Sequence, residues 1–208
     1  MAQKDAEYRT VLNQSLVNTC DGSSIALMAG WIHKEKFQAL NGPEIFTSYI
    51  EKPYKQLLLG STEIVLENIK QKLESKGVNT ANLYSISLPF NTVEVFDYDE
   101  IAKQVNLIDP DIIWVSLGAP KQELFMSKLH SHINRGIMFG IGAAFNFYIG
   151  NLTIPQIRIG RLSLIWLSRL IKEPKKLSIR LFFYIISLPG LYWNERKNVK
   201  NIKRENLS

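Results

Sequence analysis

Three polar residues follow a strand-like apolar run and have the chemistry to bind a ligand. The run "DIIWVSLG" (111–118) ends at a glycine, turns through an Ala-Pro pair and continues as a predicted helix that opens with Lys121, Gln122 and Glu123. Gln122 can both donate and accept hydrogen bonds, which suits a sugar hydroxyl or an amide. Lys121 can neutralise a phosphate group. A solvated helix start, with Glu123 favoured by the helix dipole, is the alternative interpretation.

Glycine-containing turns occur at the ends of two predicted strands. Gly60 and Ser61 follow one strand, and Gly118 and Pro120 follow another, each pair just before a predicted helix. Ligands of parallel sheets bind beyond the carboxyl ends of the strands, where free backbone N–H groups and the helix dipole attract phosphate. We therefore expect these four residues to line a substrate site.

The elements that position these residues alternate between strand and helix. Helix 62–77 is typical, because Val65, Leu66, Ile69 and Leu73 share one face and Gly77 provides a stop. Such alternation predicts an α/β fold with a Rossmann-like parallel sheet and helices on both faces. Strands are expected at 55–61, 83–88, 111–117 and 136–141, and further helices at 3–17, 24–34, 43–51, 97–106 and 120–133.

Composition points to an ordered intracellular protein. The chain has 208 residues, of which 46% are hydrophobic, and a single cysteine, Cys20, which suits a reducing compartment. The N-terminal residues lack a signal-peptide pattern, and the longest apolar stretches fall short of the roughly 20 residues that span a bilayer. We expect a cytoplasmic location.

The net charge of +6 is unevenly distributed. Residues 155–208 carry 12 Lys and Arg against 3 Asp and Glu, whereas residues 1–154 carry 13 against 16. The sequence therefore predicts a Rossmann-like core at 1–154. A helical, basic and aromatic appendage with a frayed end follows at 155–208.

The appendage has the composition of a segment that docks on an anionic membrane surface. Basic residues attract lipid headgroups, and aromatic and leucine side chains settle into the interface. Packing in a homo-oligomer is the second interpretation, and nucleic-acid binding is the least favoured because the apolar content is high. The predicted membrane-docking residues are Arg161, Trp166, Arg169, Lys172, Lys175, Lys176 and Arg180.

Other motifs give weaker indications. "GIGAAF" (140–145) imitates a dinucleotide fingerprint but ends in phenylalanine and comes late in the fold, which argues against nicotinamide binding. The Asp-x-Asp triplets at 97–99 and 109–111 look structural, so no metal site and no cofactor are predicted. Asp21 and Gly22 form an Asp-Gly pair that would ordinarily be a turn.

Six stretches occur in the order and spacing of one known family. They resemble the WecG/TagA/CpsF glycosyltransferases over about residues 3–188. The most specific are Gly118-x-Pro120-Lys121-Gln122-Glu123 and the tryptophan, arginine and proline signature near residue 170. The stretches are "TCDGSSIA" (19–26), "NGPEIF" (41–46), "LLLGS" (57–61), "VSLGAPKQE" (115–123), "GIGAAFNFYIGN" (140–151) and "IWLSRLIKEPKKL" (165–177).

The resemblance implies an inverting, metal-independent transfer of an N-acetylhexosamine-type sugar from a UDP donor. The acceptor would be an N-acetylglucosamine linked through diphosphate to a polyprenyl lipid, so the protein would work peripherally at the inner face of the plasma membrane. The resemblance makes Asp21 the base and Gln122 a second active-site residue. It implies that Gly22, Gly42, Lys121, Glu123 and Asn146 contact substrate.

Departures from the family pattern leave an alternative open. The family usually has an earlier segment with a Thr-x-Asn motif, which we do not find before the first predicted helix. Ala39 stands where an arginine is common, and Ile165 replaces a glutamate. The alternative is an inactive family member that only binds a membrane or a partner.

Overall fold

The computed structural model of the protein describes residues 5–20, 22–152, 158–159, 162–163 and 186–199. The chain divides into two compact units, residues 1–18 with 41–153 and residues 19–40 with 154–208. The predicted division into a core at 1–154 and an appendage at 155–208 stays a prediction.

The first unit is built on a four-stranded sheet in which every pairing is parallel. The strands are β1 (Gln56–Gly60), β2 (Leu83–Ile86), β3 (Ile112–Ser116) and β4 (Ile137–Gly140). The helices are α1 (Ala6–Gln14), α3 (Gly42–Tyr49), α4 (Glu63–Ser75), α5 (Tyr98–Ile108), α6 (Lys121–His130), α7 (Ala144–Ile149) and the short 3₁₀ helix η1 (Val93–Val95). The α/β fold expected from the sequence is confirmed.

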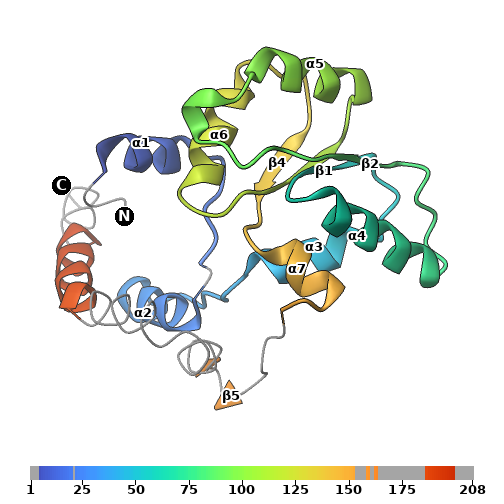
Figure 1. Ribbon diagram of the computed structural model, residues 1–208. Helices are drawn as coiled ribbons and strands as arrows, with labels where there is room; N and C mark the ends of the chain where they lie inside the picture. The colour runs from blue at the N-terminus through green and yellow to red at the C-terminus, as the bar shows by residue number, and fades with distance from the viewer. Residues whose placement is uncertain (1–4, 21, 153–157, 160–161, 164–185, 200–208) are drawn as a thin grey trace. The chain divides into compact units, whose positions relative to one another are not determined.

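Helices cover both faces of the sheet. Alternate strand residues point to opposite faces, and apolar side chains on each face pack against helices. Leu58 and Trp114 pack into a core with α3, α4 and α7. Their neighbours Leu57 and Val115 pack on the other face with α5 and α6. Figure 1 shows these two helical layers on either side of the strands. The central strands are therefore buried on both faces, which explains their continuous apolar sequence.

Local sequence signals set the limits of the helices. The Thr62 hydroxyl accepts a hydrogen bond from a first-turn N–H of α4, and Gly77, with φ +76°, follows the end of that helix. Leu66, Ile69 and Leu73 are buried on its inner face, as their spacing predicts. Thus α4 begins, packs and ends where the sequence indicates.

Two regions differ from the expected elements. Helix α1 ends at Gln14 rather than at the predicted residue 17, and Leu16 is exposed. The stretch after β4 forms a short helix, α7, that the glycine-rich sequence concealed. Phe145 and Tyr148 bury themselves one turn apart, and Gly150 ends this helix with φ +90°.

The second unit contains α2 (Ser23–His33), the two-residue strands β5 (Arg158–Ile159) and β6 (Leu162–Ser163), and a helix at 186–199. The His33 ring lies 3.2 Å from the Glu195 carboxylate, which joins α2 to that helix. Arg196 lies beside the rings of Tyr192 and Trp193, so this helix combines a basic and an aromatic surface. Among the described residues no helix is both long and apolar enough to cross a bilayer.

A buried glutamine joins the two central strands to α3. Gln56 is only 2% exposed, yet its amide nitrogen donates to the carbonyl groups of Tyr49, Ile50 and Lys52 at 3.0–3.1 Å. Its amide oxygen accepts a hydrogen bond of 2.8 Å from the indole N–H of Trp114 on β3. The buried amide is thereby satisfied at both ends.

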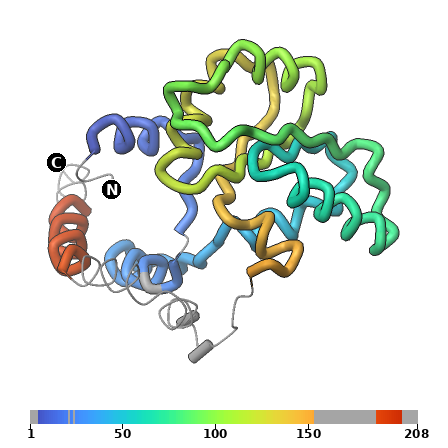
Figure 2. Tube along the Cα trace, in the orientation of Figure 1, coloured from blue at the N-terminus to red at the C-terminus, as the bar shows by residue number. Residues whose placement is uncertain are grey.

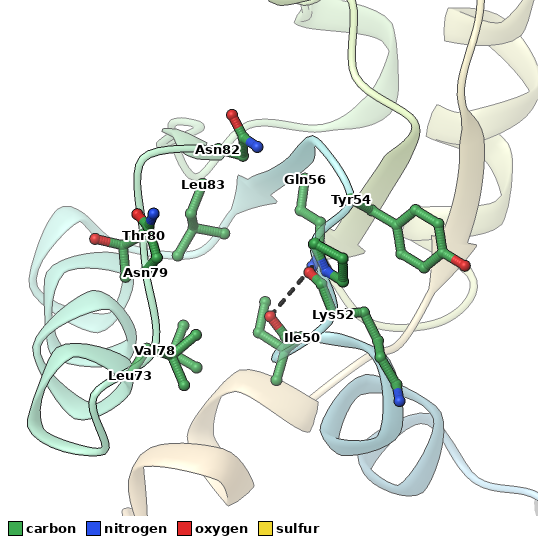
Figure 3. A pocket seen from close by; sticks show the side chains of 11 residues that line it. Ile50, Lys52, Tyr54, Gln56, Leu73, Val78, Asn79, Thr80, Asn82 and Leu83 are labelled. Atoms are coloured by element: carbon green, nitrogen blue, oxygen red, sulfur yellow. Dashed lines mark hydrogen bonds between the residues drawn. The ribbon is translucent and has the colours of Figure 1, made fainter.

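A small cavity of about 90 Å³ lies beside Gln56 (Figure 3). Its lining includes Gln56 and Leu83, which are the first residues of β1 and β2. The cavity is therefore at the amino edge of the sheet, whereas ligands of such folds bind at the carboxyl edge. We assign it to the packing of the turn between α3 and β1 rather than to the candidate site.

Replacing Gln56 by methionine should destabilise the first unit by about 3 kcal/mol. The shape is retained, but the Trp114 N–H and several carbonyl groups lose their partner, at roughly 1–3 kcal/mol for each buried group left unpaired. Urea denaturation measures the effect. The control is Gln71→Met on the exposed side of α4, which should change stability by no more than about 0.5 kcal/mol. Equal stability of the two variants would contradict the role given to Gln56.

Candidate active site

The strand order places the expected ligand site at the carboxyl ends of β1 and β3. The strand order β2-β1-β3-β4 means that the chain moves outward in one direction from β1 to β2 and in the other from β3 to β4. Such a reversal leaves a gap between the connections that follow the two central strands. Gly60 pairs with Ser116 in the sheet register, so the turns that follow β1 and β3 lie side by side.

Three residues in these turns have positive φ angles, a left-handed conformation that glycine adopts more readily than other residues. Gly60 and Gly118 have φ of +98° and +77°, and Ser61, which carries a side chain, has φ of +65°. A Cβ atom on Gly60 would lie 3.0 Å from the carbonyl oxygen of Ser116, whereas one on Gly118 would meet no described heavy atom within 4 Å. The edge is therefore tight at Gly60 and open at Gly118.

Gln122 is the second buried glutamine in the described part of the chain, at 6% exposure. Its amide oxygen accepts a hydrogen bond of 2.9 Å from the N–H of Gly142, and its amide nitrogen donates to Glu123 at 2.8 Å. It lies so close to Gly140 that a Cβ atom there would be 3.1 Å from the amide nitrogen. Gln122 thus braces the start of α6 against the loop after β4.

The carboxylate of Glu123 is only half satisfied. One oxygen accepts the hydrogen bond from Gln122, but Oε2 is buried without a hydrogen-bond partner among the described residues. Helix α1 packs against α6, and burial, together with the negative charge of Glu123, raises the pKa of the Tyr8 phenol above its usual value. Tyr8 is a neighbour that sequence reasoning did not connect with the site.

Lys121 extends toward the connection that follows β2. Its ammonium group lies 5.1 Å from the ring centroid of Phe96 and 5.5 Å from that of Phe90. Pro120, which precedes it, is the N-cap residue of α6 and makes no side-chain capping bond. The lysine is therefore positioned at the open end of the sheet, where the sequence predicts a phosphate-binding cation.

Gly42 and Asn146 have structural partners near the loop after β4. A Cβ atom on Gly42 would lie 2.6 Å from the carbonyl oxygen of Ile141, so α3 approaches this loop closely. The Asn146 side-chain oxygen accepts a hydrogen bond of 3.2 Å from Asn151. The Ser116 hydroxyl donates to the carbonyl of Gly142 at 2.7 Å, a contact that sequence reasoning missed.

Several predicted functional residues lie outside the first unit or outside the described residues. Asp21 lies outside the described residues, and Gly22 belongs to the second unit, where it precedes α2 in an extended conformation. The predicted membrane-docking residues Arg161, Trp166, Arg169, Lys172, Lys175, Lys176 and Arg180 also lie outside the described residues.

The carboxylates of the Asp-x-Asp triplets have structural roles. Asp97 caps α5 by accepting the N–H of Glu100 at 3.0 Å. Asp109 and Asp111 both pair with Arg135, and Asp111 also accepts the N–H of Lys55. Within the described residues no three acidic, histidine or cysteine side chains are grouped as metal ligands.

The fold is that of a Rossmann-like α/β protein, and its candidate site lies at the carboxyl ends of β1 and β3. Residues 1–202 match the Glycosyl transferase WecG/TagA/CpsF family, and the chain belongs to that family. The resemblance noted from the sequence is thus confirmed.

Three curated relatives share the name N-acetylglucosaminyldiphosphoundecaprenol N-acetyl-beta-D-mannosaminyltransferase. The protein of that name from Bacillus subtilis strain 168 is 26% identical over 206 residues, covering 97% of this chain and 77% of the relative. That from Bacillus spizizenii is 24% identical, covering 84% and 68%, and that from Staphylococcus aureus strain MW2 is 22% identical, covering 86% and 72%.

Replacing Gly42 by alanine should destabilise the first unit by about 1–3 kcal/mol. The added methyl group meets the backbone of Ile141, which cannot rotate away as a side chain would. Thermal or urea unfolding measures the loss. Gly190→Ala is the control, because no described atom lies within 4 Å of the added group and Gly190 lies in helix 186–199. A Gly42→Ala protein as stable as this control would mean that Gly42 is not held against the loop.

Proposed function

We propose that the protein is an inverting glycosyltransferase of bacterial surface polysaccharide or teichoic acid biosynthesis. It moves an N-acetylhexosamine-type sugar, such as N-acetylmannosamine or its uronic acid, from a UDP donor. The acceptor is N-acetylglucosamine linked through diphosphate to a polyprenyl lipid. The observation that carries the proposal is the family match over residues 1–202, supported by the shared name of the curated relatives.

The chemistry requires one bond to form as another breaks. The acceptor hydroxyl oxygen attacks the anomeric carbon from the side opposite the UDP oxygen, which leaves with the bonding electrons, so the configuration inverts. The hydroxyl proton passes to a base, and the proposal gives this role to the carboxylate of Asp21. Placing the base beside the reacting hydroxyl also lowers the entropic cost of the step.

The residues of the carboxyl edge support the binding part of the proposal. The departing diphosphate gains negative charge, which Lys121 can neutralise and the N-terminus of α6 can stabilise. The open space at Gly118 allows a ligand to approach the backbone closely. Gln122 holds the start of α6 against the loop after β4 by accepting the hydrogen bond from Gly142. It therefore positions this edge whether or not it also contacts the sugar.

A lipid-borne acceptor requires the protein to reach a membrane surface. The basic and aromatic composition of residues 155–208 supports peripheral binding at the inner face of the plasma membrane. Anionic headgroups would bind the lysines and arginines, while aromatic side chains enter the interface.

Replacing Asp21 by asparagine should lower the rate of sugar transfer by about 10²–10⁴-fold, because the amide cannot take the proton. Transfer of radiolabel from UDP-N-acetylhexosamines to a short-chain lipid acceptor measures the rate. Asp99→Asn is the matched control, since Asp99 is an exposed carboxylate on α5. An Asp21→Asn enzyme with the wild-type rate would overturn the base assignment. No transfer by the wild type would favour a binding protein without turnover.

Reversing two charges of the appendage should weaken membrane binding by more than about 30-fold. Lys175→Glu with Lys176→Glu removes two attractive charges, each worth about 1 kcal/mol near an anionic surface, and adds two repulsive ones. Flotation with vesicles of phosphatidylglycerol and phosphatidylcholine measures binding. Lys70→Glu with Lys103→Glu, two exposed lysines of the first unit, is the charge-matched control. Equal flotation of the two double variants would contradict docking through the appendage.

A further inference from the structure

A fully exposed phenylalanine lies in the connection between β2 and α5. Phe90 exposes 104% of its reference area, whereas the nearby apolar residues Leu88, Val93 and Phe96 are buried. A single exposed apolar side chain needs no explanation by itself. The position of Phe90 does, because this connection leaves the sheet at the carboxyl edge.

The connection is fixed to α6 rather than free at the surface. Phe96 packs edge-on against Phe125 of α6, with ring centroids 5.1 Å apart. The Tyr98 hydroxyl donates a hydrogen bond of 2.7 Å to the carbonyl of Val93, which closes the turn around η1. Figure 2 shows the chain running from β2 across to the side of the sheet where α6 begins. Phe90 is therefore held beside the start of α6.

Phe90 and Lys121 form one composite surface. The lysine comes from the end of β3 and the phenylalanine from the end of β2, and β1 lies between these two strands. The ammonium group lies 5.5 Å from the centroid of the Phe90 ring and 5.1 Å from that of Phe96. The two rings limit where the lysine can go, so the positive charge stays next to the exposed aromatic ring.

The two groups match the two ends of a nucleotide. An exposed aromatic ring offers a face on which a base can stack, and every base has such a face. A cation beside it offers charge to the phosphates, and the attraction of a lysine to a ring at an exposed site is weak enough for an anion to compete. A nucleoside diphosphate carries an aromatic base and an anionic diphosphate joined by a ribose, so one molecule can offer a partner to each group of this surface.

We propose that Phe90 is the residue on which the base of the donor nucleotide stacks, with Lys121 binding its diphosphate. This inference rests on the proposed function, which supplies a uridine diphosphate donor. Phe90 is a binding residue and takes no part in proton transfer. Its contribution is the same in the bound ground state and in the transition state, so it acts on the affinity for the donor.

Calorimetric titration of the full-length protein with UDP and with inorganic pyrophosphate tests the assignment. Phe90→Ala should weaken UDP binding about 10-fold, in line with the usual loss when a stacking aromatic is removed, and leave pyrophosphate binding unchanged. Phe90→Tyr should bind UDP as the wild type does. Lys121→Gln should weaken both ligands. Ile64→Ala, which removes an exposed apolar side chain from α4, is the control and should change neither.

The outcomes separate this inference from the function on which it rests. If wild type binds UDP and Phe90→Ala binds it equally well, the stacking assignment is wrong and the donor proposal stands. Equal weakening of UDP and pyrophosphate by Phe90→Ala would also overturn it, because the ring would then act through Lys121. If Phe90→Ala instead lowers vesicle flotation and leaves UDP affinity intact, the ring serves the membrane. Absence of UDP binding by the wild type would overturn the donor proposal together with the stacking role.

Discussion

The pairing of β1 with β3 is the constraint on which the remaining structure depends. These strands are separated in sequence by a complete strand, two α-helices and a short 3₁₀ helix, yet they are neighbours in the sheet. The Gln56 to Trp114 hydrogen bond crosses this pair within the apolar core, where a buried polar group without a partner would be costly. A shift of the two strands by one residue would break that bond and exchange the residues of the two core faces. The same register brings the turn at Gly60 beside the turn that follows Ser116.

The carboxyl edge shows a second polar arrangement with a different purpose. Gln122 is satisfied by Gly142 and Glu123, so the start of α6 is held rigidly against the loop after β4. The groups that remain available for a ligand lie around it. They are the ammonium group of Lys121 and the open backbone at Gly118. Ligand binding requires polar groups without protein partners that are held in place by a rigid framework.

Sequence reasoning reached most of the fold because its signals are local or periodic. The apolar run of β1, the cap at Thr62 and the stop at Gly77 indicate their elements without any distant contact. It failed at α7, where glycines on both sides concealed six helical residues that are stabilised mainly by burial of Phe145 and Tyr148. It also predicted that Gln122 is an active-site residue but did not predict that its side chain holds α6 against the loop after β4. The partner Gly142 lies twenty residues away, and nothing in the local sequence marks the contact.

Local and periodic patterns in the chain were sufficient to predict the fold class, the family and the residue types available at the carboxyl edge. Alternation of elements and ordered motifs are properties of the chain that do not depend on how distant parts meet. The strand order, the burial of Gln56 and Gln122, and the neighbours of Lys121 follow from long-range packing and became known from the folded structure. Phe90 and Lys121 are brought together by two different strand ends. Contacts of this kind arise because packing of the two helical layers on the sheet fixes where each connection runs, and this packing involves the whole first unit.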